Sequence, residues 1–129
     1  MNNKYFLNLS NSLKASKYNK PAIIKIRYSK KSLDVLSILL KEGYIRGYFI
    51  DNCTVTKYIC ILVKYIDDHN LLNIKTLNLN KQRTYLSVTK LKTHFTAFDL
   101  LILSTKKGIM SHLNAINLNI GGFPIINII

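Results

Sequence analysis

The sequence predicts an α+β protein of two small domains, and three observations lead to this prediction. Residues 1–66 hold two segments with helical spacing of apolar residues, together with short runs typical of strands. An acidic cluster, Asp67-Asp68-His69-Asn70, follows and marks a natural boundary. The second half, residues 67–129, is mostly β with one short helix near its end. We therefore expect an N-terminal helix-strand-helix-hairpin domain over 1–66 and a C-terminal β-rich domain over 67–129.

The first half begins with an amphipathic helix over residues 5–18. Phe6, Leu9 and Leu13 recur there at helical spacing, opposite a polar face. Residues 22–27 alternate apolar and cationic side chains after this helix, which is typical of a half-buried strand.

A second helix is predicted to begin at Ser29 or Ser32 and to reach about Glu42, where Gly43 is suited to end it. Lys30 lies in its first turn, where a cation opposes the helix dipole unless an anion lies nearby. The apolar stripe of this helix comprises Leu33, Val35, Leu36, Leu39 and Leu40.

Two strands, residues 44–50 and 55–66, are predicted to form a hairpin around Asp51-Asn52. The acidic cluster that follows places two carboxylates beside His69, which raises the alternative of a metal or acid–base site. Adjacent residues on a turn point apart, and no second cluster with ligand spacing accompanies them. A solvated linker is the favoured interpretation.

The second half opens with a strand-like stretch at Ile74 and Leu77, a basic segment at 81–85 and a further run at 86–92. Arg83 and Tyr85 are two residues apart, which places them on one face of a strand. This pair can hold a phosphate and offer a ring for stacking on a base or sugar. The alternative is an exposed strand face without a ligand.

A buried strand at Leu100–Leu103 ends in the loop Ser104–Gly108. This loop combines two hydroxyls, from Ser104 and Thr105, with two ammonium groups, from Lys106 and Lys107. Such a loop can hold phosphates or ribose hydroxyls without catalysing a reaction.

A short helix follows the loop and ends the predicted site. Ser111 is suited to cap a helix that runs to Leu118, and Asn119 can take the left-handed conformation that stops it. His112 is expected on the solvated face of this helix. Residues 125–129 form the final strand.

The charge of the chain points to an anionic partner. Lys and Arg number 19 against six Asp and Glu, which gives a net charge of +13. Nucleic acid is the usual partner of such a chain, and an anionic membrane surface or no partner at all are the alternatives. Membrane insertion is not expected, because the longest apolar runs fall far short of the ~20 residues of a spanning helix. No signal-peptide core or import presequence is recognisable at the N-terminus.

Catalysis, metal binding and redox chemistry find little support in the sequence. Cys53 and Cys60 do not have the C-x-x-C spacing of metal or redox pairs. A chain with only two cysteines in this arrangement fits a reducing compartment. The Ser104–Gly108 loop lacks the phosphate-loop spacing, and no paired carboxylates stand at catalytic spacing. His94 and His112 have no evident catalytic partner. We expect no enzyme activity, no cofactor and no small-molecule substrate.

The end of the chain carries a specific motif of hydroxyl, glycine and apolar positions. It comprises Ser104, Thr105, Gly108, Ile109, Met110, Ser111, Gly121 and Gly122, with Lys107 at a commonly basic position. In these residues the chain resembles the universal small-subunit ribosomal protein eight, in its bacterial or organellar form. Residues 39–45 resemble the family's Leu-x-x-Glu-Gly-aromatic-Ile segment, and the similarity extends over essentially the whole chain.

The resemblance implies a two-domain α+β protein that binds the central domain of small-subunit ribosomal RNA directly and supports its assembly. Neighbouring small-subunit proteins are the other implied partners. The implied RNA-binding residues are Ser104, Thr105, Lys106, Lys107, Gly108, Arg83, Tyr85, Ser29, Lys30, Lys31, Lys14, Gly121 and Gly122. The glycines are expected to let backbone amides approach the RNA closely.

Two departures from the family pattern affect these contacts. The first helix has Ser12, Lys14 and Ala15 where the family usually carries arginines and an asparagine. Lys106 replaces a third hydroxyl, which makes one contact of the loop ionic.

The abundance of Asn, Ile, Lys, Leu and Tyr fits an AT-rich genome. With the family resemblance, it favours an organelle-encoded protein of a mitochondrial ribosome in the matrix. A plastid or a bacterial cytoplasm is the alternative, and a non-ribosomal RNA-binding module is the alternative function.

Overall fold

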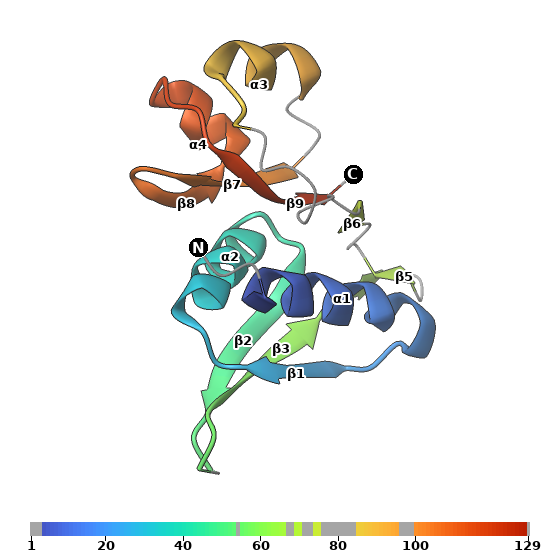
Figure 1. Cartoon of the computed structure of the whole chain (residues 1–129). Coiled ribbons are helices and arrows are strands. Elements are labelled where there is room, and N and C mark those ends of the chain that lie inside the picture. The colour runs from blue at the N-terminus through green and yellow to red at the C-terminus, as the bar shows by residue number, and fades with distance from the viewer. Residues whose placement is uncertain are drawn as a thin grey trace. The chain divides into compact units, whose positions relative to one another are not determined.

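The computed structural model describes residues 4–53, 55–66, 69–70, 74–75, 85–95 and 100–128, and it has the α+β architecture that the sequence predicts (Figure 1). The chain divides into two compact units, Met1–Asn73 and Ile74–Ile129. A functional domain boundary at residue 66 stays a prediction. Among the helices of the described ranges, none is both long and apolar enough to cross a membrane.

The first unit is built on an antiparallel sheet with the strand order β1-β3-β2. Its elements are α1 (Lys4–Asn19), β1 (Ile23–Arg27), α2 (Lys30–Lys41), β2 (Ile45–Asp51) and β3 (Tyr58–Val63). Two short strands, β4 (Tyr65–Ile66) and β5 (His69–Asn70), pair with each other beyond β3. This order confirms the predicted helix-strand-helix-hairpin arrangement.

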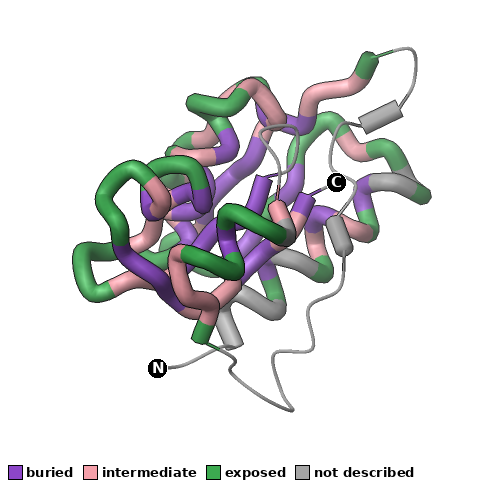
Figure 2. The backbone as a smooth tube through the Cα atoms, turned by 90° about the horizontal axis from the view of Figure 1, so that it is seen from above, coloured by how far each residue is buried: buried purple, intermediate pink, exposed green. Residues whose placement is uncertain are grey.

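Both helices of the first unit cover the same face of the sheet. In β1, Ile24 and Ile26 are buried, whereas Ile23, Lys25 and Arg27 are exposed. The core between sheet and helices comprises Leu9, Leu13, Ile24, Ile26, Val35, Leu36, Leu39, Ile59, Ile61 and Val63. Each fully buried aliphatic side chain of this kind stabilises the fold by about 1.5–3 kcal/mol. Figure 2 shows the buried positions along the strands and the exposed ones at the turns.

The ends of α2 follow the sequence closely, but its buried stripe differs from the prediction. Ser29 is the N-cap residue, although its side chain makes no cap hydrogen bond, and Gly43 has a left-handed φ of +82°. Leu40 was expected in the core and is 41% exposed. The stripe is centred on Ser32, Val35, Leu36 and Leu39. At 100° per residue Leu40 therefore lies about a quarter-turn from its centre.

The second unit contains a sheet with the strand order β6-β9-β7-β8 and two short helices. Its elements are β6 (Ile74–Lys75), α3 (Val88–His94), β7 (Leu100–Thr105), β8 (Gly108–Ser111), α4 (His112–Asn117) and β9 (Phe123–Ile128). Leu91, Leu101, Leu103 and Ala115 form its helix-side core. Ser111 caps α4 through the amide of Asn114, and Asn119 has a φ of +58°, both as predicted.

Helix α3 corrects the prediction of a single short helix in this half, because no helix was predicted within the run at 86–92. The hydroxyl of Ser87 accepts the N–H of Lys90 and caps the new helix. Leu91 is fully buried against the core of the unit. The helical conformation gives the Lys90 amide a hydrogen-bond acceptor and buries Leu91. Together these two gains outweigh the β-propensity of Val88 and Thr89.

His112 is fully buried, and the expectation of a solvated side chain was wrong. Pairing between β7 and β8 ends at Ile102 and Ser111, where the chain turns into α4. The next amide of β7 belongs to Leu101, and it donates to Nδ1 of His112 at 3.2 Å. The imidazole therefore replaces a strand carbonyl at the end of the ladder, because a buried N–H requires an acceptor.

We expect His112→Ala to lower the free energy of unfolding by about 2–4 kcal/mol, because it leaves the Leu101 amide unsatisfied and creates a cavity. Leu113→Ala, at a neighbouring exposed position, is the matched control. Urea unfolding measures both variants. Equal stability of the two variants would show that the imidazole contact does not support the sheet.

Candidate nucleic-acid interface

The predicted loop Ser104–Gly108 is a tight β-hairpin with a two-residue turn. Thr105 pairs with Gly108 across β7 and β8, so only Lys106 and Lys107 form the turn. Gly108 has a φ of +113°, which favours glycine at this position. Both lysines are exposed, and neither forms an ion pair within the described part of the chain. The tip of the hairpin thus presents two adjacent ammonium groups, with no counter-charge on them among the described side chains.

The two hydroxyls of the hairpin have different roles. Thr105 Oγ1 donates to the carbonyl oxygen of Gly108 at 2.8 Å and accepts the N–H of Lys107 at 3.2 Å. Its proton is therefore used inside the turn. Ser104 is partly buried, and its hydroxyl makes no hydrogen bond among the described residues. Ser104 consequently has both a donor and acceptors available for a ligand, whereas Thr105 can only accept.

Gly121 and Gly122 bring a distant segment of the chain beside the hairpin. The backbone of Gly122 exchanges two hydrogen bonds with Leu86, of 2.8 and 3.1 Å. A Cβ on Gly122 would lie 2.7 Å from the Ser104 carbonyl oxygen. A Cβ on Gly121 would lie 2.7 Å from the Tyr85 hydroxyl and closer still to the Leu86 carbonyl. These glycines are required for packing inside the protein.

This packing changes the explanation for why glycine occupies both positions 121 and 122. The sequence led us to expect free amides that approach RNA, but the N–H of Gly122 donates to Leu86. Both glycines are buried. A direct RNA contact by Gly121 or Gly122 stays a prediction, and their structural effect is to position Tyr85 and Ser104.

Tyr85 presents a half-exposed ring beside this glycine pair. Its edge-on contact with Phe123 has a centroid distance of 5.4 Å and an interplanar angle of 74°. The residue is 52% exposed, so part of the ring remains open to a ligand. Tyr85 does not lie in a regular strand, in contrast to the prediction, but directly precedes the isolated bridge at Leu86. Arg83 and its expected pairing with Tyr85 lie outside the described residues.

The remaining predicted residues belong to the first unit and form a separate group. Lys30 and Lys31 are exposed in the first turn of α2, which contains no acidic residue. Ser29 precedes them as the N-cap. Lys14 of α1 is partly buried and has an interaction partner within the protein.

The electrostatics of the second unit are almost entirely cationic. Its sequence has seven Lys and Arg residues and one acid, Asp99. Across the ranges that the structure describes, no group of three or more His, Cys, Asp or Glu side chains is positioned to hold a metal ion. The arrangement favours an anionic ligand over a metal ion.

We expect Gly122→Ala to lower the free energy of unfolding by about 1–3 kcal/mol, because its methyl group overlaps a backbone oxygen that cannot move freely. Gly47→Ala in β2 is the matched control, since its Cβ meets only Leu62 Cδ1 at 3.6 Å. The control leaves the stability unchanged or raises it by up to about 1 kcal/mol. Thermal unfolding distinguishes the two, and equal values would contradict the close approach at Gly122.

Comparison with known proteins agrees with the resemblance seen in the motifs. A family profile described as ribosomal protein S8 matches residues 6–129. The small ribosomal subunit protein uS8m of Acanthamoeba castellanii is 40% identical over 106 residues, which cover 80% of this chain and 81% of the relative. The small ribosomal subunit protein uS8 of Mycoplasmopsis pulmonis is 31% identical over 100 residues, which cover 77% of this chain and 76% of the relative.

A third relative, the small ribosomal subunit protein uS8 of Orientia tsutsugamushi strain Boryong, is 32% identical over 102 residues and 77% of each chain. The profile spans both units, including the hairpin and the glycine pair at the end of the chain. The chain therefore belongs to the ribosomal protein S8 family.

Proposed function

We propose that this protein is a structural component of the small ribosomal subunit that binds the central domain of small-subunit ribosomal RNA directly and supports its assembly. Family membership supports the ribosomal part of the proposal, because the relatives are named as small-subunit proteins. The hairpin supports the RNA contact. The observation that carries it is the Ser104 hydroxyl beside the ammonium groups of the turn lysines, none of which has a hydrogen-bond or ion-pair partner within the described part of the chain.

The hairpin residues suit the backbone and sugars of an RNA stem. Lys106 and Lys107 neutralise phosphates, and the release of counterions gives an affinity that falls with salt. The Ser104 hydroxyl donates to and accepts from base edges and ribose 2′-hydroxyls. The 2′-hydroxyl is the group that distinguishes RNA from DNA. The open part of the Tyr85 ring stacks on a base or sugar. Shape therefore contributes more than base sequence to recognition.

Residues of the first unit are proposed to make RNA contacts of their own. Lys30 and Lys31 oppose the dipole of α2, and a nearby phosphate would remove this unfavourable interaction. Ser29 and Lys14 of the first unit, and Arg83 of the second unit, belong to the proposal as further contacts because of the family resemblance.

The proposed location is a mitochondrial ribosome. The relative named uS8m is a mitochondrial small-subunit protein and shares 40% identity with this chain. The abundance of Asn, Ile and Lys is typical of a protein encoded in an AT-rich genome, which supports synthesis inside the organelle.

We expect Ser104→Ala to weaken binding to a transcript of the small-subunit central domain by about 0.5–3 kcal/mol. The lower value is the net contribution of one hydrogen bond, and the upper value applies when the RNA group that bonded to Ser104 is left buried without a partner. Thr93→Ala on α3 is the control, because the Thr93 hydroxyl bonds only to its own helix. Filter binding at a fixed salt concentration measures both variants. An unchanged affinity for Ser104→Ala would remove this hydroxyl from the proposed interface.

A further inference from the structure

The sheet of the first unit has an open face opposite its two helices. Residues paired directly across an antiparallel sheet share one face. The register therefore aligns Lys25, Cys60 and Phe49 in one row and Arg27, Tyr58 and Asp51 in the next. Ile23 and Leu62 continue the same face beyond the first row. We call the set of Ile23, Lys25, Arg27, Phe49 and Tyr58 the open face.

Apolar and aromatic side chains on the open face are accessible to a ligand. Phe49 is 49% exposed and Ile23 is 50% exposed, although both lie within regular strands. Tyr58 is partly buried in the central strand. Phe49 and Tyr58 lie on adjacent strands in successive rows, which places them as diagonal neighbours about 7–8 Å apart.

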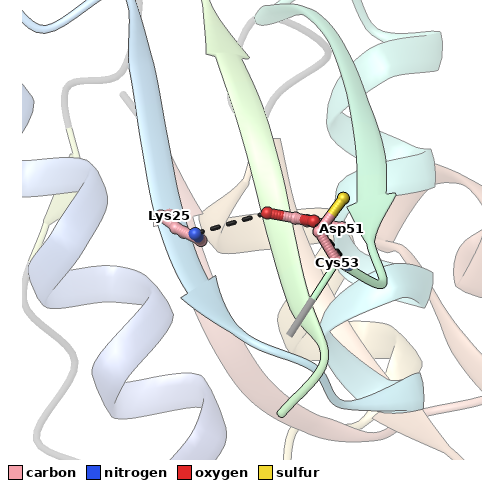
Figure 3. Close-up of polar contacts among 3 residues, drawn as sticks. All are labelled: Lys25, Asp51 and Cys53. Atoms are coloured by element: carbon pink, nitrogen blue, oxygen red, sulfur yellow. Dashed lines mark hydrogen bonds and ion pairs between the residues drawn. The ribbon is translucent and has the colours of Figure 1, made fainter. Parts of the chain in front are cut away.

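The single acidic side chain of the open-face rows is already neutralised. Lys25 Nζ lies 3.3 Å from the Asp51 carboxylate (Figure 3). The same ammonium group lies 4.8 Å from the centre of the Tyr58 ring. The amide of Cys53 donates to the same carboxylate at 2.9 Å. Hydrogen bonds from Cys53, followed by the contact with Lys25, lower the pKa of Asp51. Asp51 stays ionised and bound to Lys25.

Arg27 is left as the uncompensated charge of this surface. It is exposed and forms no ion pair among the residues that the structure describes. It is paired with Tyr58 across the sheet on the outer strand β1. Phe49 lies on the other outer strand, β2, one row along the same face. Aromatic rings beside a guanidinium on a sheet surface are the elements with which proteins bind single-stranded nucleic acid.

We propose that the open face of the β1-β3-β2 sheet binds a single-stranded segment of RNA, with one base stacked on Phe49 and a phosphate held by Arg27. This contact is separate from the hairpin of the second unit and does not depend on it. The charge of the surface favours RNA over an acid-poor protein partner, which would leave Arg27 without a counter-charge. Lys25 covers the ring of Tyr58, which leaves Phe49 as the more accessible aromatic side chain of the open face.

The experiment uses the full chain carrying Lys106→Ala and Lys107→Ala, so that the hairpin contributes little. The probe is a fluorescein-labelled single-stranded RNA of about 12 nucleotides, the length of one typical single-strand binding site. Phe49→Ala is expected to weaken binding about 5- to 100-fold, the range for loss of one stacked base. Arg27→Ala is expected to reduce the slope of log affinity against log salt by about 0.7.

Leu40→Ala and Lys41→Ala on α2 are the matched controls, since both residues are exposed on another surface of the same unit. Circular dichroism verifies that each variant is folded. Equal RNA affinity for Phe49→Ala and Leu40→Ala overturns the proposal. So does a Phe49→Ala variant that keeps its RNA affinity but fails to enter the small subunit, because the open face would then dock a protein.

Failure of this proposal is distinguishable from failure of the proposed function. In the background with both hairpin lysines intact, Phe49→Ala leaves the affinity for the central-domain stem unchanged, whereas Ser104→Ala lowers it. A loss of stem affinity in Phe49→Ala equal to that in Ser104→Ala would contradict the separation of the two surfaces.

Discussion

The close approach of three backbone segments at Gly121–Gly122 is the constraint on which the candidate interface depends. Gly122 lies against Ser104 on one side and exchanges two hydrogen bonds with Leu86 on the other. Any side chain at either glycine would overlap a carbonyl oxygen. Tyr85 and the end of β7 therefore lie in one region of the second unit, although about twenty residues of chain separate them. The proposed RNA surface follows from this packing.

The same unit satisfies its backbone polar groups with side chains where the sheet ends. His112 accepts the Leu101 amide where the β7–β8 ladder stops, and Thr105 bonds within the turn. Ser111 and Ser87 cap the two short helices. These contacts hold the hairpin in one geometry before any ligand binds, which reduces the entropy lost on binding. Rigid presentation suits recognition of RNA by shape.

Much of the fold was predictable because local signals coincide with tertiary packing. The α1 and α2 helices, the hairpin of β2 and β3, the left-handed Gly43 and Asn119 and the buried strand β7 were all expected from spacing and caps. Helix α3 was missed, since its seven residues depend on the burial of Leu91. The role of His112 was missed because its partner, the Leu101 amide, is adjacent only in the folded sheet. The residue types of the site were predictable. That the Thr105 hydroxyl bonds within the turn, whereas the Ser104 hydroxyl does not, depends on the geometry of the folded turn.

The most direct test of the account is the salt dependence of binding to a central-domain transcript of small-subunit RNA. If both hairpin lysines contact phosphates, Lys106→Ala with Lys107→Ala lowers the slope of log affinity against log salt by up to about two. The matched variant, Lys90→Ala with Lys92→Ala on the exposed side of α3, leaves the slope closer to that of the unmodified protein. If both double variants show the same slope as the unmodified protein, the hairpin turn does not contact phosphates and the proposed interface is wrong.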